Sequence, residues 1–230
     1  MIPKLATHYV TVHLPKARST QDEARARFDG SRPVLVTAAV QSEGRGRNAR
    51  QWWNAPRALA ASLAFKPEWS SAAWPRVSLV AGLAVRQVIG NARLKWPNDI
   101  IIDGAKVGGI LSEADATGVV VGLGLNLWWP DAPEGVGAIS SVDPGEGHPV
   151  AVGEQWAAAL LARMGELEEE WGRDEYVAAC VTLGQQIEWD SGSGRAIDVA
   201  LDGSLVVATA QGTIVLSSGE VHSVRPTTLT

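Results

Sequence analysis

The sequence holds a single cysteine, Cys180, among its 230 residues. An intrachain disulfide is therefore excluded, which is typical of a protein from a reducing compartment. The chain begins without a signal-peptide pattern, and no apolar run reaches the length that crosses a membrane. These absences predict a cytoplasmic protein with no membrane partner. Cys180 stands in an apolar stretch and is expected to be a small core residue.

Histidine is also scarce. The four histidines lack the spacing of metal ligands, so the sequence predicts no metal site built by the protein alone. Positive charge is in deficit overall, with a formal net charge of −5, so no general field favours nucleic acid as a partner. The positive charge that is present gathers locally, because Arg45, Arg47 and Arg50 fall within six positions.

These arginines belong to residues 41–52, here called the arginine loop. Gly44 and Gly46 alternate with the first two arginines. Glycine lets the backbone approach a ligand closely, and a guanidinium group offers a planar fork of donors to carboxylate or phosphate. The segment is neither a P-loop nor a dinucleotide fingerprint. Its composition leaves two interpretations open, a mobile loop that folds over an anion and a solvated surface loop.

A second polar segment spans residues 95–99 and leads into a predicted hairpin. Asp-Gly at residues 103–104, between two apolar runs, is a strong signal for a two-residue turn. The returning strand carries Lys106 and then two adjacent glycines at 108–109, which weaken a strand interior and suggest close approach of a ligand or another backbone. The alternative is that Asp99 and Lys106 form an ordinary ion pair across the hairpin.

A third segment, residues 122–127, ends a predicted strand with Gly-Leu-Gly-Leu-Asn-Leu. A buried Asn126 would need partners for both its amide donors and its oxygen. An adenine edge or a ribose could supply them, and so could neighbouring backbone.

In this order the segments resemble the biotin protein ligases, also called biotin–acetyl-CoA-carboxylase ligases. The resemblance covers almost the whole chain and rests on Ser19-Thr20, Gln41, Gly44-Arg45-Gly46-Arg47, Arg50, Trp52, Lys95 to Asp99, Lys106 to Leu111, Gly122 to Asn126 and Ser218-Gly219-Glu220-Val221. It implies an α+β fold, a mixed and largely antiparallel sheet with helices of the class II synthetase-like kind, over residues 1–183. Short β runs separated by Gly and Ser turns predict a small barrel over residues 184–230, which the resemblance identifies as SH3-like.

The resemblance implies an ATP-dependent, AMP-forming ligase. Such an enzyme joins biotin to ATP with Mg²⁺, giving biotinyl-5′-adenylate, and then passes biotin to one lysine of a biotin carboxyl carrier domain. The family's repressors carry an N-terminal DNA-binding domain, and Ser19-Thr20 comes too early here to leave room for one, so no repressor role is expected. Relatives often form homodimers through a sheet edge, and the sequence does not decide this.

The resemblance also assigns roles by position. Biotin would contact Ser19, Thr20, Gln21, Gln41, Gly44, Arg45, Gly46, Arg47, Lys106, Gly108 and Gly109. The nucleotide would contact Arg47, Arg50, Trp52, Lys95, Asn98, Lys106, Gly109 and Asn126. The catalytic set would be Lys106, Arg45, Arg47 and Asp99, with Asp99 orienting Lys106 or placing Mg²⁺. These residue types fit the chemistry, because two anions must approach each other and biotin supplies its own carboxylate as nucleophile.

Some positions depart from the family pattern. Gln21 stands where asparagine is usual, Ala49 where glycine is usual, and residues 54–58 replace a glycine-rich stretch. Asn48 tolerates the left-handed region and could re-phase the turn of the arginine loop. Thr20 followed by Glu23 also matches a capping box, so the hydroxyls of Ser19-Thr20 could cap a helix, bind a ligand or divide these roles.

Three other functions stay open. A lipoate or octanoate ligase or transferase shares the fold superfamily but generally lacks the arginine loop. The departures from the pattern keep a non-catalytic biotin sensor in play, and the C-terminal barrel could be a protein-interaction module on a scaffold.

The periodicity predicts the following elements: strands over 7–13, 34–40, 59–65, 100–102, 106–114 and 119–127; helices over 20–28, 75–89, 152–171 and 174–183; and a long loop over 130–149.

Overall fold

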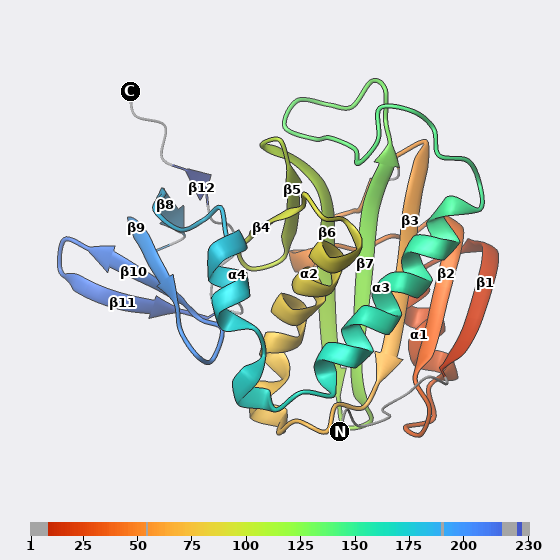
Figure 1. Ribbon diagram of the computed structural model, residues 1–230, viewed down its shortest axis with the longest axis horizontal. Helices are drawn as coiled ribbons and strands as arrows, with labels where there is room; N and C mark the ends of the chain where they lie inside the picture. The colour runs from red at the N-terminus through yellow and green to blue at the C-terminus, as the bar shows by residue number, and fades with distance from the viewer. Residues whose placement is uncertain (1–8, 54, 190, 218–224, 227–230) are drawn as a thin grey trace.

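The computed structural model describes residues 9–53, 55–189, 191–217 and 225–226. Its main sheet has seven strands in the order β1-β2-β3-β7-β6-β5-β4 (Figure 1). The strands are β1 (Val10–Ala17), β2 (Val34–Gln41), β3 (Arg57–Phe65), β4 (Arg93–Lys95), β5 (Asp99–Ile102), β6 (Ala105–Asp115) and β7 (Gly118–Trp128). β1 runs parallel to β2 and every other neighbouring pair is antiparallel. The predicted mixed, largely antiparallel sheet is confirmed.

Helices cover both faces of this sheet. In Figure 1, α2 (Val77–Val88) and α3 (His148–Met164) lie in front of the sheet and α1 (Thr20–Arg27) lies behind it. α2 is apolar along most of its length, as expected for a helix packed between a sheet and a second helix. Trp156 of α3 is fully buried and donates its indole N–H to the carbonyl oxygen of Ala81 at 3.3 Å, which fixes α3 against α2.

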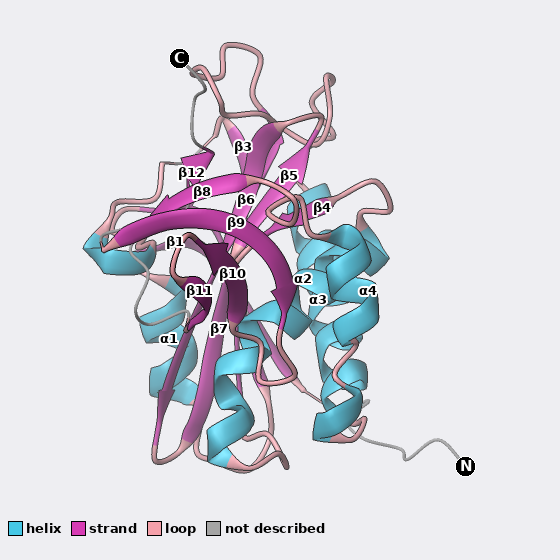
Figure 2. Ribbon diagram, turned by 90° about the vertical axis from the view of Figure 1, so that its left-hand side faces the viewer, coloured by secondary structure: helices cyan, strands magenta, loops and turns pink. Residues whose placement is uncertain are grey.

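A second, five-stranded antiparallel sheet follows α4 (Arg173–Ala179). It contains β8 (Gln186–Trp189), β9 (Gly192–Val199), β10 (Leu205–Thr209), β11 (Gly212–Leu216) and β12 (Arg225–Pro226), in the order β11-β10-β9-β8-β12. Figure 2 views the molecule from the side on which this sheet lies. The arrangement agrees with the expected SH3-like unit. The proposed boundary at residues 183–184 falls between α4 and β8 and stays a prediction.

Two buried tryptophans join the loop between β9 and β10 of the second sheet to the rest of the protein. Trp96 donates its indole N–H to the carbonyl oxygen of Gly203 at 3.0 Å, and Trp171 donates to that of Leu201 at 2.9 Å. Both rings are buried, and the apolar side chains of Val199 and Leu205 belong to the same core as the helices. The segment that begins at Lys95 is therefore anchored at its start to the C-terminal sheet.

Several predicted boundaries were wrong. The helix expected over 152–171 ends at Met164, because Leu167 is extended and residues 168–170 form a separate short turn, η3 (Glu168–Glu170). Pro75 lies in a 3₁₀ turn, η2 (Ser71–Arg76), and α2 starts only at Val77. The strand expected over 7–13 is Val10–Ala17, and the helix expected over 174–183 ends at Ala179. Strand β4 was not predicted, since three residues carry too short a pattern.

The match at residues 218–221 lies outside the described residues. Of the helices that the structure describes, none combines the length and the apolar character needed to span a bilayer. Cys180 is buried, as expected.

Candidate functional site

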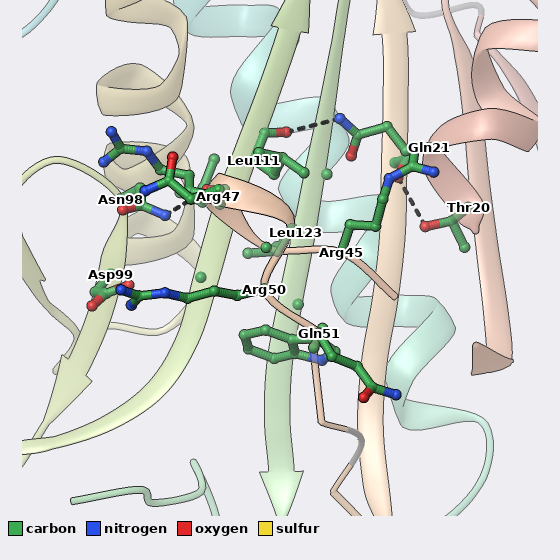
Figure 3. Close-up of a pocket in the computed structure, with 18 of the residues that line it drawn as sticks. Thr20, Gln21, Arg45, Arg47, Arg50, Gln51, Asn98, Asp99, Leu111 and Leu123 are labelled. Atoms are coloured by element: carbon green, nitrogen blue, oxygen red, sulfur yellow. Dashed lines mark hydrogen bonds between the residues drawn. The ribbon is translucent and has the colours of Figure 1, made fainter. Parts of the chain in front are cut away.

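A cavity of about 400 Å³ lies on the sheet face that carries α1 (Figure 3). This size suits a small-molecule site. Most of the predicted site residues line it: Ser19, Thr20, Gln21, Gln41, Arg45, Gly46, Arg47, Arg50, Trp52, Lys95, Asn98, Asp99, Lys106 and Gly109. The predicted residues that do not line it are Gly44, Gly108 and Asn126.

Glycines form much of the cavity floor. Strand pairing sets Gly124 of β7 beside Gly109 of β6, and Gly122 beside Leu111. A Cβ at Gly124 would stand 2.7 Å from the ring of Trp52, and one at Gly109 would stand 3.3 Å from it. A Cβ at Gly122 would collide with the side-chain oxygen of Gln21. The bare backbone thus lets the two polar-tipped side chains lie directly on the sheet.

Gly108 faces different neighbours from the adjacent Gly109. A Cβ there would stand 2.7 Å from the carbonyl oxygen of Gly124 and 2.5 Å from the side chain of Leu125. The close approach expected at the two adjacent glycines is therefore real, but at Gly108 it comes from backbone and core packing.

Uncharged groups fill the α1 end of the cavity. The amide and the hydroxyl of Thr20 both donate to Oε1 of Gln41, at 2.7 and 2.9 Å, and the hydroxyls of Thr20 and Ser62 lie 2.9 Å apart. Ser19 is the N-cap of α1, with its Oγ 3.5 Å from the amide of Asp22. The N-cap is therefore Ser19 rather than Thr20, one residue before the start of the possible capping box, and both residues line the cavity.

Gln21, the residue that departs from the family's asparagine, lies in this same uncharged end. Its side chain is buried and its amide group donates to the carbonyl oxygen of Leu111 at 3.4 Å. It therefore presents an amide to the cavity across the glycine floor.

The arginine loop is a small hairpin over the cavity. Its rungs are an Arg45–Gln51 bridge, an N–H···O bond of 2.7 Å from Gly46 to Arg50, and one of 2.9 Å from Trp52 to Gly44. Its tip is a 3₁₀ turn, η1 (Arg47–Ala49). Asn48 has φ 56° and ψ 39°, so it takes the left-handed conformation that the sequence suggested.

The cationic end of the cavity holds Lys106 and Arg47. Nζ of Lys106 lies 2.5 Å from Oδ1 of Asp99, so the expected ion pair is present inside the site. Burial lowers the pKa of Arg47, and the carboxylate of Asp99 opposes that shift. A guanidinium group stays charged at neutral pH even so, which makes this end of the cavity a place for anionic oxygens.

Asn98 contributes backbone order beside this end. Its side-chain amide donates to the carbonyl oxygen of Ile110 at 2.9 Å, and the amide of Ile110 donates back to the carbonyl oxygen of Asn98 at 2.9 Å. Asn98 thus fastens the 95–99 segment to β6 while its side chain lines the cavity.

Residues 135–137 clasp the backbone of Lys106. The amide of Lys106 donates to the carbonyl oxygen of Gly135 at 3.0 Å, and the amide of Gly137 donates to that of Lys106 at 2.9 Å. Asn126 holds this segment, because its side-chain amide donates to the carbonyl oxygen of Gly137 at 2.9 Å. Asn126 is 3% exposed, and its Oδ1 is buried with no hydrogen-bond partner among the described residues.

Sequence reasoning missed part of the site. Ser62 of β3, Leu111 of β6 and Gly122, Leu123 and Gly124 of β7 line the cavity, although none of them was assigned a role. Period two was visible in those strands, but the face toward the cavity was not.

A second hollow adjoins the cavity. It is lined by Gln41, Ser42, Gln51, Trp52, Trp53 and Trp129. Trp53 is 65% exposed there.

No group of three or more possible metal ligands occurs among the residues that the structure describes. Asp99 is the single carboxylate residue lining the cavity in that part of the chain.

Comparison with known proteins defines the class of this fold and site. Residues 17–126 match the model of the Biotin/lipoate A/B protein ligase family. The biotin–[acetyl-CoA-carboxylase] ligase of Mycobacterium tuberculosis is 31% identical over 215 residues, which cover 84% of this chain and 79% of that protein. The corresponding ligase of Paracoccus denitrificans is 36% identical over 152 residues, covering 60% of this chain and 61% of that protein. The chain belongs to the biotin protein ligases of this family.

Solved structures agree on the fold. The biotin protein ligase of Aquifex aeolicus in complex with biotin and ATP superposes with a TM-score of 0.80 at 23% identity, over 96% of this chain and 100% of that one. The Helicobacter pylori biotin acetyl coenzyme A carboxylase synthetase with bound biotinylated ATP gives 0.66 at 19% identity, over 90% of this chain and 100% of that one. The α+β catalytic fold with a small C-terminal β unit is confirmed.

Proposed function

We propose that this protein activates biotin with ATP and transfers the biotinyl group to one lysine of a biotin carboxyl carrier domain. One observation carries the proposal: a single cavity joins an uncharged amide and hydroxyl end, at Thr20 and Gln41, to a cationic end, at Lys106 and Arg47. Biotin has the matching order of groups, a neutral urea at one end and a carboxylate at the other. The ligase class follows from the family.

In the first step a carboxylate oxygen of biotin attacks the α-phosphorus of ATP. The new C–O–P linkage forms as the bond to the leaving pyrophosphate breaks. Both reactants are anionic, so Lys106 and Arg47 lower the electrostatic cost of their approach and stabilise charge in the transition state. Asp99 holds the ammonium group of Lys106 on the reacting side of the hairpin.

The nucleotide lies, in this proposal, beside Trp52 and the 95–99 segment. The floor glycines leave the Trp52 indole flat against the sheet, where an adenine can pack on it. Asn126, which does not line the cavity, supports this region by holding residues 135–137, which clasp the backbone of Lys106. Lys95 and Arg50 line the cavity and extend its positive charge toward the phosphates.

Mg²⁺ enters with ATP as part of the substrate. The donor set fits that role, because Asp99 offers one carboxylate and Mg²⁺ commonly combines one or two carboxylates with substrate phosphates and waters. When bound, the ion would neutralise phosphate charge beside Asp99.

In the second step the neutral amine of the acceptor lysine attacks the carbonyl carbon of the adenylate. An amide bond forms, the bond from the acyl carbon to the phosphate oxygen breaks, AMP leaves, and the amine nitrogen releases one proton to solvent. The uncharged ring of Trp53 at the neighbouring hollow is available to a protein substrate. A cytoplasmic location fits this scheme, since the acceptor carriers belong to metabolic enzymes and the one thiol, Cys180, is buried.

The test is exchange of labelled pyrophosphate into ATP in the presence of Mg²⁺ with biotin, lipoate or octanoate. The proposal expects exchange with biotin alone, followed by biotinylation of a carrier domain. Exchange with lipoate or octanoate would assign the protein to another branch of the same family. Absence of exchange in a folded protein that still binds biotin would support a sensor.

A further inference from the structure

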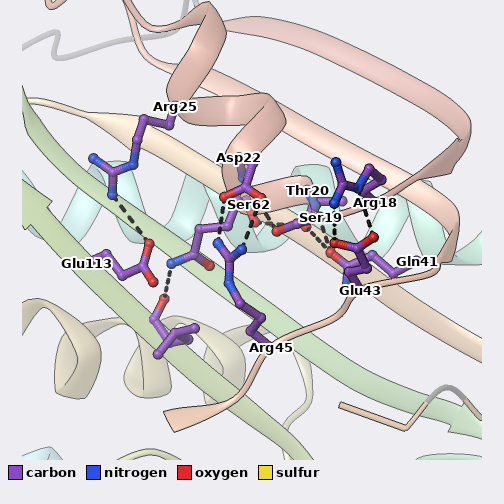
Figure 4. A network of polar contacts seen from close by, with 12 residues as sticks. Arg18, Ser19, Thr20, Asp22, Arg25, Gln41, Glu43, Arg45, Ser62 and Glu113 are labelled. Carbon is purple, nitrogen blue, oxygen red and sulfur yellow. Dashed lines mark hydrogen bonds and ion pairs between the residues drawn. The ribbon is translucent and has the colours of Figure 1, made fainter. Parts of the chain in front are cut away.

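Arg45 forms an ion pair with Asp22, an aspartate outside the cavity. Its two terminal nitrogens, Nη1 and Nη2, donate to the two carboxylate oxygens of Asp22 at 3.0 and 2.5 Å (Figure 4). Such a two-point pair fixes direction as well as distance. Asp22 lies in the first turn of α1, directly after Thr20 and Gln21, which face the cavity.

A second two-point pair stands one residue before Gly44. Nε and Nη2 of Arg18 each donate to Glu43 at 2.8 Å, and the amide of Glu43 donates to the carbonyl oxygen of Arg18 at 2.8 Å. The arginine loop is therefore attached on both sides of Gly44 to the chain that starts α1 (Figure 4).

Fixing Arg45 fixes the rest of the hairpin. The hydrogen bonds from Gly46 to Arg50 and from Trp52 to Gly44 make the loop one hydrogen-bonded unit, so the positions of its residues depend on one another. Arg47 stands at the tip of that unit and lines the cavity. The position of Arg45 therefore determines where Arg47 lies.

We propose that Asp22 is a positioning residue that keeps the arginine loop closed over the bound adenylate, acting through Arg45. The inference rests on the proposed ligase function and assigns a task that none of the predicted site residues has. Arg45 links Asp22 to the loop, and Arg47 is the loop arginine that the closed hairpin places at the cationic end of the cavity.

The test follows adenylate retention. The enzyme is loaded with labelled biotin and ATP, free ligands are removed, and release of biotinyl-adenylate into excess unlabelled biotin and ATP is timed. We expect Asp22→Asn to speed release roughly two- to five-fold, the size expected for a partly exposed ion pair. Asp22→Glu keeps the charge and should retain most of the wild-type adenylate retention. The melting temperatures of both variants should hardly differ from that of the wild type.

Glu23→Gln is the matched control. Glu23 occupies the next position of the same helical turn and pairs with Arg27, away from the loop. Glu23→Gln removes one exposed acidic partner from α1 and should leave the release rate of the adenylate unchanged. Equal effects of Asp22→Asn and Glu23→Gln would reduce Asp22 to a helix residue and overturn the inference.

A double-mutant cycle tests the route. In an Arg45→Gln background, Asp22→Asn should add no further loss of retention, because coupled residues are not additive. Full additivity would overturn the inference. Wild-type protein that folds but forms no adenylate contradicts the proposed function itself, whereas normal formation with identical release in wild type and Asp22→Asn contradicts only the role of Asp22.

Discussion

Lys106 and Asp99 face each other across the β5–β6 hairpin, with Nζ of the lysine 2.5 Å from Oδ1 of the aspartate. Lys106 and Gly109 both line the cavity although they are three positions apart on one strand, where regular alternation would set them on opposite faces. The pairing register shifts between them, since Ile100 pairs with Gly108 and Ile101 with Lys106. This bulge turns Lys106 into the site, a use of bulges that recurs beside active sites.

Lys106→Ala should therefore slow adenylate formation strongly and spare the fold. The side chain of Lys106 is 40% exposed and holds no core group, so the melting temperature should change little. Loss of a cation at the reacting phosphate should reduce adenylate formation by about 10²- to 10³-fold. Pyrophosphate exchange and thermal unfolding measured together check this, with the exposed Lys66→Ala as control. A parallel fall of activity and melting temperature would make Lys106 a structural residue.

The hairpin itself was predictable, but its bulge was not. The Asp-Gly turn announces itself locally, and Asp103 and Gly104 have φ of 49° and 79°, the left-handed values that such a turn requires. The register shift depends instead on how β6 meets β5 and residues 135–137, which are distant in sequence. Composition could identify Lys106 as a candidate without saying which face of the strand it takes.

The arginine loop shows the same division. Its glycines and arginines marked it as a ligand loop, and the left-handed conformation of Asn48 followed from residue type. The Asp22–Arg45 pair was invisible, because it joins positions 23 apart whose proximity is set by β2 returning beside α1. The helix expected over 152–171 does not continue through residues 165–171 for a related reason. The acidic run favours a helix locally, but Trp171 is buried and bonded to the distant carbonyl oxygen of Leu201.

Arg47→Gly should let the adenylate escape. Burial lowers the pKa of Arg47, which shows that its guanidinium group is partly removed from water where it lines the cavity. The adenylate should then dissociate about tenfold faster or more, because a partly desolvated guanidinium is the loop's contact with its anionic part. Pulse-chase release of labelled adenylate measures this. An unchanged release rate in a folded variant would remove Arg47 from the lid.

Two glycines of the hairpin region should separate fold from function. Gly124→Ala places a methyl group 2.7 Å from the ring of Trp52, a side chain that can shift, so the KM for ATP should rise several-fold with a small change in melting temperature. Gly108→Ala meets the backbone oxygen of Gly124 and the packed side chain of Leu125, so it should cost about 1–3 kcal/mol of unfolding free energy.

Denaturant unfolding and ATP titration distinguish the two variants. Gly147→Ala, with no heavy atom within 4 Å of the added Cβ, is the neutral control. If Gly124→Ala destabilised the protein as much as Gly108→Ala while leaving the KM for ATP unaltered, the floor would be a packing feature without a role in nucleotide binding.

Trp96→Phe should loosen the junction between the two sheets. The substitution keeps an aromatic ring in the buried site but leaves the carbonyl oxygen of Gly203 without the indole donor at 3.0 Å. A buried acceptor stripped of its donor costs about 1–3 kcal/mol, so the midpoint of denaturant unfolding should fall by a corresponding amount. Trp53→Phe changes an exposed ring and should leave the midpoint where it is. Equal midpoints for wild type and Trp96→Phe would mean that the contact contributes nothing to the junction.

Asp143 should give the protein a stability that depends on pH only in acid. The guanidinium of Arg57, helped by the amide of Gly145, lowers the pKa of Asp143 from 3.8 to about 2. A carboxyl group whose pKa is lower in the folded state stabilises the fold above its unfolded pKa and loses that contribution as pH falls from about 4 to 2. The difference in melting temperature between wild type and Asp143→Asn should thus be constant above pH 5 and shrink below pH 4. A difference in melting temperature that widens in acid would mean that this carboxylate is better accommodated in the unfolded chain than beside Arg57.

Asp143→Asn should also affect activity at neutral pH. Asp143 tethers the far end of residues 130–147 to β3, and residues 135–137 of that segment clasp Lys106. The variant should therefore show a modestly slower pyrophosphate exchange.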